Sequence, residues 1–243
     1  MSVDALRPDL IVKTIELLHQ RIAERFPDSG LNNVCNQLLV VAQNMQARAD
    51  WIGKPVNWLR FLTWAICLII VGVAIAPLVF LAFSENGFEL HDENWFTEVL
   101  QFMETATNNV VLIGAAIFFL LTAETRYKRQ RALKALHELR SIAHVIDMHQ
   151  LTKDPHRITG KKVFRSTEGS PKLEMTQFLL RRYLDYCSEM LSLTGKIAAV
   201  YAQEFDDQGA ITGASELETL TTGLSRKIWQ KIAMLHTIEE ESE

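Results

Sequence analysis

One long uncharged stretch constrains the fold of this chain more than any other feature of its sequence. It runs from Phe61 to Phe83, and Thr63 carries the only hydroxyl group within it. About 20 apolar helical residues are enough to cross the hydrocarbon core of a bilayer. Trp58 and Trp64 lie near the start of the stretch, where aromatic anchors are expected. The stretch therefore predicts a transmembrane helix.

A second apolar stretch is shorter and runs from Val110 to Ala123. Extended back to Thr105 it reaches about 28 Å at 1.5 Å per residue, which is enough for one crossing if Asn108 and Asn109 lie at the outer interface. We therefore expect a second transmembrane helix. The alternative is a buried helix of a soluble core.

The charges that flank the two stretches predict an orientation. Arg48, Lys54 and Arg60 precede the first stretch, and the second is followed by Arg126, Lys128, Arg129, Arg131 and Lys134. The segment that connects the stretches is acidic and has no Lys or Arg. The positive-inside rule then places both termini in the cytoplasm. We expect a multi-pass protein of the plasma (inner) membrane, assuming a bacterial cell.

The rest of the chain is expected to be helical. The predicted fold class is an all-α membrane protein: two transmembrane helices, an N-terminal helical hairpin and a C-terminal cytoplasmic bundle of long helices with a coiled coil. The expected segments are an N-terminal cytoplasmic helical hairpin (1–54), transmembrane helix 1 (55–84), an acidic extracytoplasmic loop with an amphipathic helix (85–104), transmembrane helix 2 (105–124), a cytoplasmic stalk helix (125–151), a basic loop (152–171) and a C-terminal helical hairpin (172–243).

The C-terminal hairpin shows the spacing of a coiled coil. Apolar and small side chains recur there at alternating steps of three and four residues, namely Leu173, Thr176, Leu180, Tyr183, Cys187, Met190, Thr194, Ile197 and Tyr201. A turn is expected around Gly209 to Gly213, and Ser215 with Glu218 has the spacing of a capping box that opens a final helix. A monomer of this length could bury such a seam only partly, so we expect a homo-oligomer.

The second apolar stretch offers one candidate site. Steps of three and four residues place polar and small side chains on one line, which could surround a pore in an oligomer. The pore-lining candidates are Glu104, Asn108, Leu112, Ala115, Phe119 and Thr122. The alternative is that this line packs against Gly72 and Ala76 of the first stretch.

Two further sets of residues could bind a ligand or a partner. One is the polar side of the stalk helix, with His137, Arg140, His144 and Asp147, where the fixed charge of Arg140 favours an anionic ligand or an interhelical contact over a metal ion. The other is the basic loop, with Lys161, Lys162 and Arg165, which could bind anionic lipid, a nucleotide or an acidic protein. The alternatives are a solvated or subunit-contacting helix side and a solvated loop.

No sequence motif indicates an enzyme. We find no nucleophile elbow, zinc-protease helix, dinucleotide loop or phosphate loop, so we expect no catalytic residue, metal or cofactor. A formal net charge of -4 gives no reason to expect nucleic acid. The sequence thus favours a non-enzymatic integral membrane protein that acts as a self-associating scaffold or interaction module. Its expected partners are the lipid bilayer, copies of itself, and a cytoplasmic protein or anionic ligand. The alternative is a homo-oligomeric ion channel or pore lined by the second transmembrane helix.

Overall fold

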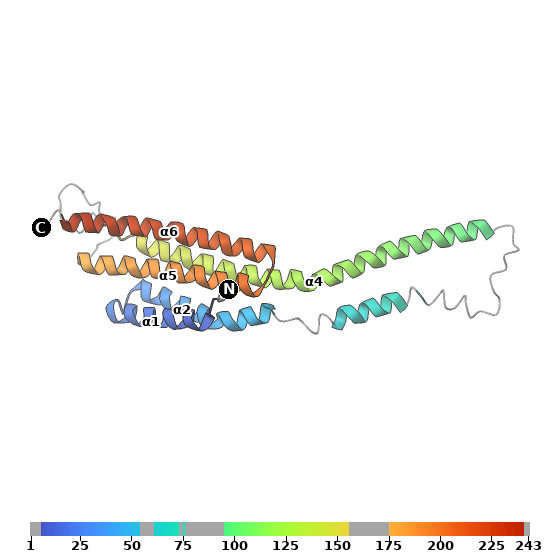
Figure 1. Ribbon diagram of the computed structural model, residues 1–243, viewed down its shortest axis with the longest axis horizontal. Coiled ribbons are helices and arrows are strands. Elements are labelled where there is room, and N and C mark those ends of the chain that lie inside the picture. The colour runs from blue at the N-terminus through green and yellow to red at the C-terminus, as the bar shows by residue number, and fades with distance from the viewer. Residues whose placement is uncertain (1–5, 54–60, 73–74, 76–94, 156–174, 241–243) are drawn as a thin grey trace, which may run out of the picture. The chain divides into compact units, whose positions relative to one another are not determined.

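The computed structural model describes residues 6–53, 61–72, 75, 95–155 and 175–240, and the regular elements in these ranges are all helices (Figure 1). The chain divides into two compact units. One combines Met1–Gly53 with Arg129–Glu243, and the other is Lys54–Lys128. We call the first the bundle unit and describe each unit by itself.

Helices α1 (Pro8–Arg25) and α2 (Gly30–Gly53) pack against each other in the bundle unit. Pro8 occupies the first turn of α1, where its missing N–H costs nothing, and Asp9 and Arg25 lie at the ends that favour their charges. Its buried side chains, Ile11, Ile15, Leu18 and Ile22, follow the helical repeat. The predicted N-terminal helical hairpin is thus present in the described residues.

Helix α5 (Gln177–Glu204) packs against α1, α2 and α6, and can be followed in Figure 1. The side-chain oxygen of Thr176 accepts a hydrogen bond from the backbone N–H of Leu179 at 3.3 Å and caps its start. The predicted seam from Leu180 to Tyr201 is buried, but so are further side chains around the helix, including Tyr186, Leu191, Leu193 and Val200. Since the bundle itself covers α5, its heptad pattern gives no reason to expect self-association. Leu173 lies outside the described residues.

Helix α6 (Gln208–Glu240) begins earlier than the sequence pattern predicted. Gly209, Gly213 and Ser215 are all inside the helix, so both the predicted turn and the predicted capping box are wrong. Asp207 takes the capping role instead, because its Oδ1 accepts hydrogen bonds from the backbone N–H groups of Gly209 at 2.9 Å and Ala210 at 3.2 Å.

Helix α4 spans Trp95–Leu151, and its residues from Arg129 onward belong to the bundle unit. One side of that part is buried and consists of Ala132, Ala135, Leu136, Leu139, Ile142, Ala143 and Ile146. The predicted stalk helix is therefore a packed member of the bundle between Arg129 and Leu151.

The second unit contains a helical stretch at residues 61–72 and the part of α4 up to Lys128. Among the helices described, none combines the length and the apolar character that a membrane crossing requires.

This finding corrects the sequence-based view of the chain. The predictions of two transmembrane helices, of a multi-pass plasma membrane location with cytoplasmic termini and of an ion channel are wrong. Part of the first predicted span lies outside the described residues, namely 73–74 and 76–83. The predicted acidic loop up to residue 94 also lies outside them.

Candidate functional site

The predicted pore-lining residues lie on α4 in the second unit. Glu104, Asn108, Leu112, Ala115 and Phe119 are exposed. The hydroxyl of Thr122 donates to the backbone oxygens of Phe118 and Phe119, both at 3.0 Å, so its hydrogen bonding is satisfied within its own helix. Because no described helix can cross a membrane, the interpretation of this line as an ion path is wrong.

The predicted ligand residues on the polar side of α4 are only partly brought together. His137 and Arg140 line one small cavity of about 360 Å³ against the start of α6, where Arg140 Nη2 lies 2.8 Å from Glu216 Oε2. His144 is exposed, and Asp147 Oδ1 accepts a hydrogen bond from Gln150 Nε2 at 2.6 Å. The basic loop with Lys161, Lys162 and Arg165 lies outside the described residues.

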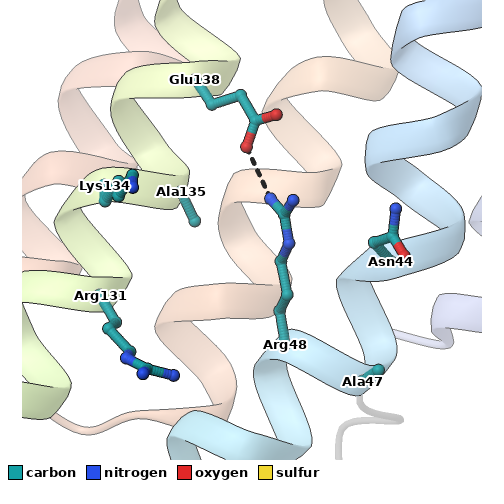
Figure 2. A pocket seen from close by; sticks show the side chains of 7 residues that line it. All are labelled: Asn44, Ala47, Arg48, Arg131, Lys134, Ala135 and Glu138. Atoms are coloured by element: carbon teal, nitrogen blue, oxygen red, sulfur yellow. Dashed lines mark hydrogen bonds and ion pairs between the residues drawn. The ribbon is translucent and has the colours of Figure 1, made fainter.

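A larger cleft lies between α2 and α4 and has a volume of about 640 Å³ (Figure 2). The spacing of its residues explains the cleft, since side chains three and four positions apart share one side of a helix. Its lining residues are Asn44, Ala47 and Arg48 from α2, and Arg131, Lys134, Ala135 and Glu138 from α4. We call this site the basic cleft.

Positive charge dominates the basic cleft. Its described lining residues include three cations, Arg48, Arg131 and Lys134, and one carboxylate, that of Glu138. Glu138 Oε2 lies 2.6 Å from Arg48 Nη1, and this hydrogen bond raises the pKa of Arg48 (Figure 2). Lys134 forms no ion pair with any residue that the structure describes. The lining residues Ala47 and Ala135 have short side chains and therefore fill little of the cleft.

A buried tyrosine lies close to the Arg48–Glu138 pair. Tyr201 on α5 is only 1% exposed, and its hydroxyl has no hydrogen-bond partner of ordinary geometry among the described residues. Burial raises the pKa of Tyr201, while the nearby Arg48 guanidinium lowers it in part and Glu138 raises it further.

These residues suit the binding of an anion. Guanidinium and ammonium groups are strong donors to carboxylates and have no acceptor. Among the described residues that line the cleft there is no His, Cys, Ser or Thr that could act as a nucleophile or as a proton carrier near pH 7. In the described part of the chain no group of three or more His, Cys, Asp or Glu side chains could hold a metal ion.

Sequence reasoning found these cations but misinterpreted them. The sequence pattern indicates Arg48, Arg131 and Lys134 only as the basic residues that flank the expected membrane spans. The repeat Arg131, Lys134, Glu138 does indicate one helix side, but nothing in the sequence pairs it with Arg48, about 90 residues away in the chain. Comparisons with known proteins add no assignment, because no protein-family model, curated protein or solved structure matches this chain.

Proposed function

We propose that this chain is a non-catalytic helical interaction module that binds an acidic segment of a partner protein in the basic cleft. The observation that carries the proposal is that Arg48, Arg131 and Lys134 line one open cleft in which Glu138 is the one carboxylate among the described lining residues (Figure 2). Glu138 already neutralises Arg48 in part, and Lys134 adds a positive charge that no carboxylate of the described residues pairs with.

The shape of the basic cleft supports a peptide rather than a compact anion. Its residues on α4 run from Arg131 to Glu138, about 10 Å along the helix axis. A segment with carboxylates spaced along its length could reach Arg131 and Lys134 together. A carboxylate could also compete with Glu138 for Arg48.

The test is a titration of the purified full-length chain into a fluorescently labelled glutamate-rich peptide, followed by anisotropy. The double variant Arg131→Gln with Lys134→Gln should weaken binding at least about tenfold, and added salt should weaken the wild type. Arg226→Gln with Lys227→Gln is the matched control, because it removes the same charge from an exposed part of α6. Absent binding by the wild type, or an equal loss in the control, would overturn the proposal.

A second candidate function is self-association through the unit Lys54–Lys128. Its described helices expose large apolar side chains, including Phe61, Trp64, Leu68 and Phe118. Large exposed apolar patches are typical of interaction surfaces. Sedimentation velocity should show a complex larger than a monomer that becomes smaller in Trp64→Ser with Phe118→Ser. A wild-type monomer at high concentration would exclude this function.

A further inference from the structure

A second polar cavity lies between α1 and α5 and shares no residue with the basic cleft. It has a volume of about 650 Å³ and is lined by Arg21, Glu24 and Arg25 from α1 and by Arg182 and Tyr186 from α5. Arg21 and Arg25 are one turn apart, so both extend from the same side of α1. Three guanidinium groups thus line one pocket, and Glu24 is the one carboxylate among its described lining residues. We call it the arginine pocket.

Aromatic rings hold the guanidinium groups of this pocket in place. Arg25 Cζ and Arg182 Cζ lie 5.5 Å and 5.6 Å from the centroid of the same ring, that of Phe178. Arg21 Cζ lies 5.6 Å from the ring of Tyr186. A guanidinium that stacks on a ring uses its flat face, and its N–H groups remain available at its edge for an acceptor.

The neighbouring carboxylates do not use all of these donors. Arg21 is committed, with Nη2 2.6 Å from Glu189 Oε2. Arg182 Nη1 lies 3.6 Å from Asp185 Oδ2, which is an ion-pair distance but too long for a hydrogen bond. Arg25 donates to the hydroxyl oxygen of Tyr186 at 3.2 Å and has no ion pair with a described residue.

We infer that the arginine pocket binds a phosphate group, held by Arg25 and Arg182. Two guanidinium groups already oriented by one ring match a dianion that accepts several hydrogen bonds, since arginine pairs with phosphate through two parallel N–H donors. A phosphate brings more acceptor oxygens and more negative charge to the two guanidinium groups than a single carboxylate does. This site is separate from the basic cleft and does not depend on the function proposed for it.

The experiment is calorimetric titration of the full-length chain with inorganic phosphate, with a phosphoserine peptide and with its unphosphorylated twin. Arg25→Gln and Arg182→Gln should each weaken binding of phosphate at least about tenfold. Arg182→Lys should lose part of the affinity, because it keeps the charge but loses the planar fork. Arg181→Gln, which removes the neighbouring charge outside the pocket, and Arg131→Gln with Lys134→Gln should bind phosphate like the wild type. Circular dichroism checks that each variant is folded.

The relative affinities for the three ligands identify the source of the phosphate group. Binding of both phosphate forms with equal strength supports a free phosphate ligand, and tighter binding of the phosphopeptide supports a phosphorylated macromolecule. Equal affinity for the phosphopeptide and its unphosphorylated twin would overturn the proposal. So would undetectable phosphate binding at millimolar concentration, or unchanged binding in both Arg25→Gln and Arg182→Gln.

Discussion

The two parts of α4 differ in whether their apolar side chains are buried or exposed. Between Arg129 and Leu151, Leu139 and Ile146 are completely buried in the bundle unit, whereas Leu112 and Phe118 are about two-thirds exposed in the other unit. The first part alternates apolar and charged side chains at helical spacing, while the second is apolar on every side from Val110 to Leu121. The comparison teaches that periodicity, more than total apolar content, indicates which side chains this chain buries.

The largest expected effect comes from one pair of substitutions on that helix. Leu139→Ala should lower the free energy of unfolding by about 2–5 kcal/mol, because it leaves a cavity in a closed core. Leu112→Ala should change it by less than about 0.5 kcal/mol, since that side chain is largely exposed. Urea titrations followed by circular dichroism measure both values. Similar losses in the two variants would remove the distinction between the two parts.

Glycine substitutions sharpen the contrast between packed and open helix sides. A methyl group at Gly195 on α5 would lie 3.1 Å from Thr221 Oγ1 on α6, so Gly195→Ala should destabilise the bundle by about 1–3 kcal/mol. At Gly223 nothing lies within 4 Å, and Gly223→Ala should stabilise α6 by about 0.5–1 kcal/mol. Thermal unfolding distinguishes the two, and a stabilised Gly195→Ala would contradict the close approach of α5 and α6.

The cap of α6 gives a pH-dependent prediction. Asp207→Ala should lower stability by about 1–2 kcal/mol, because the N-terminal donors of α6 lose their acceptor. Asp207→Asn keeps a cap oxygen but removes the ion pair with Arg129 and the hydrogen bonds that Arg129 donates to Oδ2. The hydrogen bonds from Arg129 hold the pKa of Asp207 below its usual value. Stability from the charged form is therefore present above about pH 4 and is lost as the pH falls below it.

Urea titrations at neutral and acid pH test this predicted direction of the pH dependence of stability. The difference in stability between the wild type and Asp207→Asn should shrink as the pH is lowered. A difference that grew at acid pH would show that the Arg129–Asp207 pair does not stabilise the folded chain.

The smallest expected effect concerns the pair at the basic cleft. Arg48 and Glu138 have side chains that are 42% and 44% exposed, so Glu138→Gln should change stability by at most about 1 kcal/mol. The same substitution removes the only carboxylate of the cleft and should raise affinity for the glutamate-rich peptide several-fold. Unfolding and anisotropy titrations on one preparation separate the two effects. A fall in affinity would mean that Glu138 orients Arg48 for binding.

Much of the bundle could be predicted from the sequence. Pro8 marks the start of α1, and the three-and-four spacing from Leu180 to Tyr201 identifies buried positions on α5. The start of α6 could not be predicted, because Ser215 and Asp207 both precede good helical sequence. The contact that distinguishes Asp207, with Arg129, joins residues about 80 positions apart. The basic cleft depends in the same way on Arg48 meeting α4, which local patterns do not encode.

The three cysteines test the central contrast most directly, because two lie in the bundle unit and one does not. Cys35 and Cys187 are completely buried, and burial raises the pKa of each thiol to about 12, whereas Cys67 in the helical stretch 61–72 is partly exposed. The measurement is labelling of the native chain with a maleimide at neutral pH, resolved by peptide mass spectrometry. We predict rapid labelling of Cys67 and labelling of Cys35 and Cys187 only after unfolding. Labelling of Cys187 or Cys35 as fast as that of Cys67 would contradict the buried α5 and the closed bundle.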